Sequence, residues 1–136
     1  MFQRCLIYGA GFTSYAKAAP SVDLYRKYVP LIEKLYRRRW VFDSNPIELP
    51  TGMQGNLFRK PEGGLVAGVA GTMSRLQGRT PPDRSVLVRA KGVEKVKEVI
   101  LHVPGEKEQK IGFGQENGAV QFDLPGNMVA AVIEIF

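Results

Sequence analysis

The single histidine limits the chemistry that this sequence can support. His102 lies between Leu101 and Val103 in an expected strand, and there is no second imidazole and no cysteine pair to share a metal with it. A Ser-His-Asp or Cys-His site would have to use His102, but nothing brings the only cysteine, Cys5, or a serine to it. The 13 carboxylates fall mostly in turns or on exposed strand faces, and none stands out as part of the facing pair that glycoside hydrolysis requires. We therefore expect no catalytic residue, no metal and no cofactor.

Aromatic residues near an expected helix-to-strand junction are the candidate binding residues. Trp40, together with Tyr36, Phe42 and Phe58, could form a platform for sugar rings or bases. We select Trp40, Tyr36 and Phe58 as the carbohydrate-binding candidates. The alternative is that Trp40, next to Val41, belongs to the core, because aromatic residues supply much of the buried area in small domains.

Positive charge is concentrated in the N-terminal part of the chain. Residues 1–60 carry ten basic and four acidic side chains, whereas residues 61–136 carry nine of each, so the net charge of +6 belongs to the first part. Arg37, Arg38 and Arg39 form its densest group and are the candidate nucleic-acid-binding residues. The alternative is that the triplet ends a helix, where cations favour the negative end of the helix dipole. The RNA-recognition aromatic signature, a KH-type glycine loop and paired zinc ligands are missing, which makes nucleic acid the less favoured partner.

Length and composition indicate one ordinary folded domain, or a small domain with an appendage. The chain has 136 residues, of which 44% are hydrophobic and 24% charged, which excludes disordered and fibrous classes. The longest apolar run, Met128–Ile133, has six residues, far fewer than the roughly 20 that a membrane span needs. We expect a soluble protein without a membrane partner. A cytoplasmic location is favoured because no convincing signal peptide is present.

The first 40 residues are expected to be helical. Leu24, Tyr28, Leu31 and Leu35 recur at helical spacing and form a one-sided apolar stripe. Pro30 interrupts this segment and predicts a kink or a break into two helices.

From Trp40 onward the pattern changes to short strands separated by glycine, proline and asparagine. Period-2 alternation indicates strands with one buried face, and Asn117-Gly118 predicts a tight hairpin turn. A long loop is expected over residues 71–83. The expected strands are Trp40–Phe42, Asn56–Arg59, Leu65–Ala70, Ser85–Ala90, Lys97–Val103, Gln109–Phe113, Ala119–Leu124 and Met128–Ile135. They predict a mainly β fold, an antiparallel β-sandwich of about seven to eight strands over residues 41–136, with a helical extension over residues 1–40.

Three groups of residues carry a family resemblance. The first runs from Tyr25 through a Tyr-Val-Pro-Leu stretch to Trp40-Val41-Phe42. The second comprises Leu49-Pro50-Thr51-Gly52, Gly55-Asn56-Leu57-Phe58-Arg59 and Gly63-Gly64. The third comprises Val93–Val103, Gly118–Phe122, and Leu124-Pro125 before Met128–Ile135. Together they resemble the C-terminal region of a (β/α)-barrel glycoside hydrolase, with the last barrel helix followed by an appended β-sandwich.

The resemblance implies a non-catalytic accessory domain, because no position matches a catalytic motif of these enzymes. It implies a structural role or weak carbohydrate binding. The partner would be the catalytic barrel of a parent enzyme, in which the catalytic carboxylates lie at the ends of the barrel strands. Without the barrel, the apolar stripe that includes Leu24 and Leu35 should fold back on the sandwich or pair with a second copy of the chain, and on this ground we expect a dimer.

Overall fold

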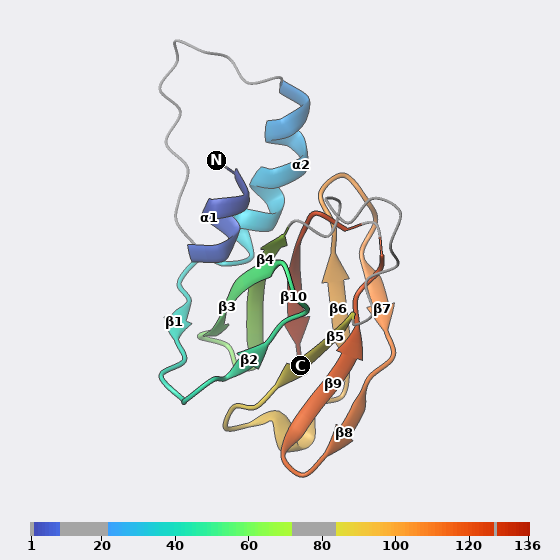
Figure 1. The fold of residues 1–136 in the computed structure, drawn as a ribbon. Coiled ribbons are helices and arrows are strands. Elements are labelled where there is room, and N and C mark those ends of the chain that lie inside the picture. The colour runs from blue at the N-terminus through green and yellow to red at the C-terminus, as the bar shows by residue number, and fades with distance from the viewer. Residues whose placement is uncertain (1, 9–21, 72–83, 127) are drawn as a thin grey trace.

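The computed structural model describes residues 2–8, 22–71, 84–126 and 128–136. They form three layers, in which two helices cover one face of a two-sheet sandwich (Figure 1). Of the loop expected over residues 71–83, Gly71 lies in a strand and the other residues lie outside the described ranges. The helices are α1 (Phe2–Tyr8) and α2 (Val22–Glu33); the strands are β1 (Arg39–Trp40), β2 (Ile47–Glu48), β3 (Met53–Arg59), β4 (Leu65–Gly71), β5 (Ser85–Val88), β6 (Val99–His102), β7 (Gln109–Ile111), β8 (Gly114–Glu116), β9 (Ala119–Asp123) and β10 (Ala130–Ile135).

The strands form two antiparallel sheets, which confirms the predicted antiparallel sandwich. The first has the order β1-β3-β4-β10-β6-β7, and the second has the order β2-β5-β9-β8. The hairpin predicted at Asn117-Gly118 joins β8 to β9, and both residues have positive φ values, 52° and 73°. Two short strands, β2 and β8, were not expected. The segment predicted as a single strand, Gln109–Phe113, ends in the first sheet at Ile111, and the chain then enters the second sheet as β8.

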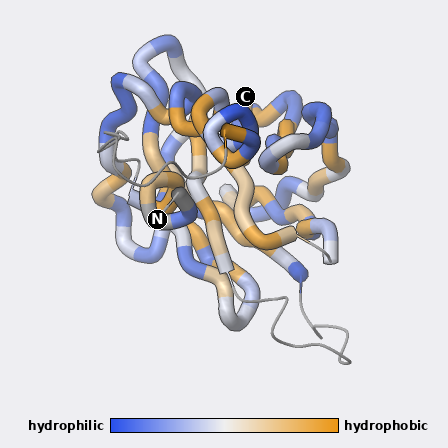
Figure 2. The backbone as a smooth tube through the Cα atoms, turned by 90° about the horizontal axis from the view of Figure 1, so that it is seen from above, coloured by the Kyte–Doolittle hydropathy of each residue, from blue (hydrophilic) through white to orange (hydrophobic). Residues whose placement is uncertain are grey.

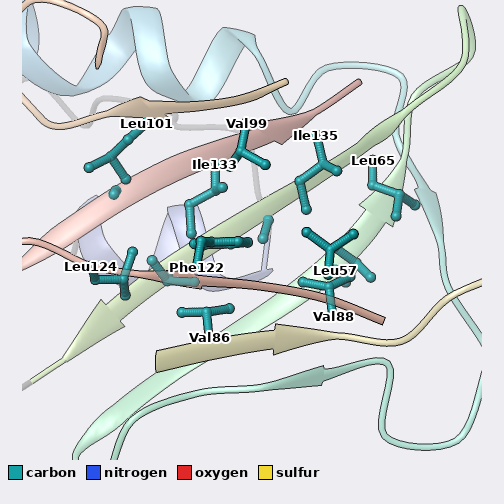
Figure 3. Packing of buried hydrophobic residues seen from close by; sticks show 14 of the residues in the cluster. Leu57, Leu65, Val86, Val88, Val99, Leu101, Phe122, Leu124, Ile133 and Ile135 are labelled. Atoms are coloured by element: carbon teal, nitrogen blue, oxygen red, sulfur yellow. The ribbon is translucent and has the colours of Figure 1, made fainter. Parts of the chain in front are cut away.

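Apolar side chains from both sheets fill the space between them (Figure 3). The alternating residues of β9, Val120 and Phe122, point inward, as their spacing predicts. The central strand β10 is buried at every position, because one face lies on this core and the other lies under the helices. Figure 2 shows the hydrophobic stretches concentrated in the middle of the molecule, with most hydrophilic stretches in the turns around it.

The helical layer packs on the outer face of the six-stranded sheet. Leu6 and Ile7 from α1, and Leu31 and Leu35 from α2 and the turn after it, contact strand residues that include Phe58. The C-terminal half of the predicted apolar stripe therefore folds back on the sandwich, which is one of the two outcomes expected for it, the other being pairing with a second copy of the chain. Leu24, in the N-terminal half of the stripe, remains 40% exposed, so the dimer stays a prediction.

Of the two outcomes expected at Pro30, a kink or a break into two helices, the break does not occur, because α2 continues through this residue. The expected place of the arginine triplet is wrong. The helix ends at Glu33, so the triplet does not lie in its last turn. Arg37 instead takes a φ of 58°, in the left-handed region, where the chain passes from helix to strand, and Arg39 already belongs to β1.

Within the residues that the structure describes, no helix is long and apolar enough to cross a membrane.

Candidate functional site

The three predicted carbohydrate-binding aromatics do not form one platform. Tyr36 is 73% exposed and Trp40 is 47% exposed, but Phe58 is completely buried. The Trp40 ring packs edge-to-face on Phe58, with the ring centroids 4.8 Å apart. Phe58 therefore supports Trp40 from beneath and presents no surface to a ligand. Its assignment as a binding residue does not fit the structure, because the helical layer covers the sheet face from which it projects.

The three arginines also separate. Arg38 donates hydrogen bonds to the carbonyl oxygens of Leu35 (3.1 Å) and Tyr8 (3.2 Å), and its guanidinium lies over the Phe58 ring. It therefore links the end of α1 to the turn that follows α2. The Arg37 guanidinium lies 5.6 Å from the centroid of the Tyr36 ring, while Arg39 is exposed on β1. Arg38 thus has a structural role, and the triplet is not a single cationic surface.

A pocket of about 440 Å³ brings two of the predicted residues, Tyr36 and Arg37, together with groups that the sequence did not single out. One wall is the end of α2 and its following turn, and the other is the turn between β3 and β4. The residues that line it are Glu33, Lys34, Tyr36, Arg37, Lys60, Pro61, Glu62 and Glu134. The lining therefore combines one exposed aromatic ring with three cationic and three carboxylate side chains.

Glu134 is the centre of a buried charged network beside this pocket. One carboxylate oxygen accepts a 2.6 Å hydrogen bond from Lys60 Nζ. The other lies 2.7 Å from His102 Nε2 and 3.3 Å from Lys34 Nζ. These partners come from the β3–β4 turn, from β6 and from the turn after α2, so a single carboxylate joins the two walls of the pocket to the sheet.

The network shifts the pKa values of its members in a consistent way. Burial alone would raise the pKa of Glu134, but hydrogen bonds from Lys60 and His102 and the positive charges of both lysines outweigh it and lower the pKa. Burial acts to lower the pKa of Lys60, but its bonds to Glu134 and Glu62 raise it overall. The pKa of Glu62 is lowered, mainly by a backbone hydrogen bond and by Lys60. All three groups are therefore held in their charged forms.

This geometry suits binding better than hydrolysis. Glu134 and Glu62 both contact Lys60 Nζ, at 2.6 and 3.1 Å, so they are close enough to form a carboxylate pair. A glycosidase needs one carboxyl group with a raised pKa to protonate the leaving group, and both of these pKa values are lowered. His102 is buried, its Nε2 faces Glu134, and its Nδ1 lies 4.0 Å from Glu108. In the described part of the chain, no three His, Cys, Asp or Glu side chains gather as metal ligands.

Sequence reasoning missed Glu134 and Lys60 as members of a site. The available signal was the position of Glu134, a carboxylate between Ile133 and Ile135 at the end of an otherwise apolar strand. A buried charge at such a position requires charged partners. Nothing in the sequence identified those partners, which lie 32 to 100 positions away along the chain.

Comparison with protein-family models, with curated proteins and with solved structures found no match to this chain. A functional assignment therefore depends on the geometry of the site.

Proposed function

We propose that the chain is a non-catalytic accessory β-sandwich domain of a glycoside hydrolase-like protein, and that it binds carbohydrate weakly in the pocket beside Tyr36. The observation that carries the proposal is the pairing of an exposed aromatic ring with a polar, charge-balanced lining. The apolar face of a sugar ring packs on an aromatic side chain, while its hydroxyl groups both donate and accept hydrogen bonds. A pocket that offers one ring and mixed donors and acceptors matches this chemistry.

The balance of charge favours a sugar over a nucleic acid in this pocket. Lys34, Arg37 and Lys60 are matched by three carboxylates in the lining. Binding to a phosphate backbone depends on uncompensated cations that replace its counterions. Here Lys60 and Lys34 already form ion pairs with Glu134, so little positive charge is left for a polyanion.

A glycan array probed with the wild-type chain and with Tyr36→Ala tests the binding role. Binding to a glycan that weakens at least tenfold in Tyr36→Ala supports the proposal. Tyr8→Ala is the matched control, because Tyr8 is also exposed, at 56%, but lies outside the pocket lining. Trp40→Ala is the second variant, since Trp40 was predicted to bind but does not line this pocket.

Three results contradict the pocket as the site: no binding to any glycan, equal losses in the Tyr36 and Tyr8 variants, or a loss in Trp40→Ala alone. The accessory role has a separate test in the genomic sequence that precedes the Met1 codon. An open frame that continues upstream into a barrel-coding region supports it, and a stop codon directly upstream contradicts it.

A further inference from the structure

The buried histidine lies behind the pocket, and the pocket lining does not include it. His102 ends β6, is 6% exposed, and is the only histidine in the chain. Its Nε2 lies 2.7 Å from Oε2 of Glu134, and its Nδ1 lies 4.0 Å from Oε2 of Glu108. Both nitrogen atoms of the ring therefore face carboxylates.

The two carboxylates define where the ring carries hydrogen. An ionised carboxylate only accepts hydrogen bonds, and the lowered pKa of Glu134 keeps it ionised, so Nε2 of His102 is the donor in this bond. In the neutral ring Nδ1 is then without hydrogen and presents a lone pair to Glu108. Only the protonated ring can donate to both carboxylates, so Nδ1 is the site of proton uptake. Imidazole is the side chain whose charge ordinarily changes between pH 5 and 8.

A positively charged His102 competes with Lys34 for one oxygen atom. Lys34 Nζ lies 3.3 Å from Oε2 of Glu134, the same atom that faces His102 Nε2. Lys60 is bound to the other oxygen, at 2.6 Å, and its side chain is 13% exposed, against 33% for Lys34. Charge on the ring strengthens its own bond to Glu134 and repels the neighbouring ammonium group. Lys34 has the longer bond and the more exposed side chain, so it is the partner that leaves.

The remaining charged groups near the ring do not take part in this competition. Lys27 of α2 packs on the turn after β6, and Glu106 in that turn bonds to a glutamine of β7. Lys110 of β7 pairs with Glu98 at 2.7 Å. Within the described part of the chain, the only carboxylates at ion-pair distance from the ring are those of Glu134 and Glu108.

We propose that His102 is a positioning residue of the carbohydrate pocket, and that its protonation releases Lys34 from Glu134 and weakens carbohydrate binding in mild acid. The proposal rests on the proposed function for the nature of the ligand. Lys34 and Tyr36 lie on the same turn and both line the pocket. The bond from Lys34 to Glu134 therefore ties the turn that carries the aromatic ring to the sheet, and its loss frees that wall of the pocket.

The first test needs no ligand. NMR of the chain with 13C-labelled histidine and lysine follows the His102 ring and the Lys34 side chain from pH 8 to pH 5, and the Lys34 signal is the one missing in Lys34→Arg. As His102 takes up its proton, the Lys34 signal should move toward that of Lys107, an exposed lysine. His102→Gln keeps a nitrogen donor for Glu134 but takes up no proton in this range, so the Lys34 signal should stay in place.

The second test measures the affinity for the strongest binder on the glycan array at pH 7.5 and pH 5.5. The wild type should bind at least threefold more weakly at pH 5.5, whereas the affinity of His102→Gln should change less than 1.5-fold. No second imidazole is present to contribute. Where His102→Gln has a lower urea midpoint than the wild type, Lys34→Gln replaces it and should also lose the pH dependence. Lys107→Gln removes the same charge at an exposed position outside the pocket and should keep it.

Three results would overturn the role of His102: a ring that takes up no proton between pH 8 and 5, a Lys34 signal that stays in place while the ring titrates, or an equal pH dependence in wild type and His102→Gln. A chain that binds no glycan contradicts the proposed function instead. The NMR comparison then still decides whether His102 controls the Lys34–Glu134 bond, so the two failures are distinguishable.

Discussion

Replacing Gly68 with alanine should separate α1 from the sheet. A Cβ atom at this position of β4 would clash with the carbonyl oxygen of Leu6 and lie 2.6 Å from its carbonyl carbon. Both are backbone atoms of α1, so no change of side-chain rotamer relieves the contact. The helix must therefore move away from β4, the strand with which it makes its most extensive contacts.

The cost follows from the side chains that α1 buries. Leu6 is completely buried and Ile7 nearly so. Full burial of a large aliphatic side chain is worth about 1.5–3 kcal/mol, so complete release of both would cost about 3–6 kcal/mol. A partial shift that keeps some of their contacts would cost about 1–3 kcal/mol, as overpacking in other cores does. We expect Gly68→Ala to lower the free energy of unfolding by about 3 kcal/mol.

Urea denaturation followed by circular dichroism measures this loss, with Gly114→Ala as the matched control. Gly114 is also a strand glycine, in β8, but a Cβ atom there would have no neighbour within 4 Å. The control should match the wild type or be slightly more stable, because alanine restricts the unfolded chain. With a urea dependence of about 1–3 kcal/mol per molar, Gly68→Ala should lower the midpoint by roughly 1–3 M. Equal midpoints for the two variants would refute the close approach of α1 to β4.

Three further predictions concern the charged groups. Because the pKa of Glu134 is lower in the folded chain than in the unfolded chain, its ionised form stabilises the fold above the unfolded pKa. This stabilisation is lost as the pH falls through the folded pKa. The urea midpoint of the wild type should therefore drop below about pH 4, and that of Glu134→Gln should drop less. Because the pKa of Lys60 is raised in the folded chain, its charged form stabilises the fold below the unfolded pKa, and this stabilisation is lost as the pH rises through the folded pKa. Above about pH 10 the urea midpoint should therefore fall in the wild type and much less in Lys60→Gln. Arg38→Ala removes two hydrogen bonds to backbone carbonyls and should cost about 1–3 kcal/mol in urea denaturation, whereas the exposed Arg39→Ala should change stability by less than about 0.5 kcal/mol.

Alternation of apolar side chains identified two of the strands that the sequence predicted correctly. In Ala119–Leu124 and Ser85–Ala90, alternate residues face a single core, so the pattern of apolar residues reports the structure directly. The missed strands β2 and β8 have two and three residues, too few for any alternation to be recognised. Both lie at the edges of the smaller sheet, where hydrogen bonding to one neighbour rather than burial defines the strand.

Burial on the outer face of the larger sheet was harder to predict, as the aromatic residues show. Trp40 and Phe58 are register partners on adjacent strands, yet one is half exposed and the other completely buried. The difference depends on where the helical layer lies, which is set by contacts between residues far apart in the sequence. Local periodicity indicates that a helix has an apolar stripe but not which strands it covers.

The buried charge at Glu134 matters for the proposed binding site more than for stability. A leucine at this position would pack under the helical layer without the cost of removing a carboxylate from water, and replacing buried ion pairs by apolar residues is often neutral or stabilising. A leucine would not hold Lys34 and Lys60, which Glu134 fixes at 3.3 and 2.6 Å from opposite walls of one pocket. What the network adds to the fold is therefore the geometry of that pocket, and the ligand binding proposed beside Tyr36 would depend on that geometry.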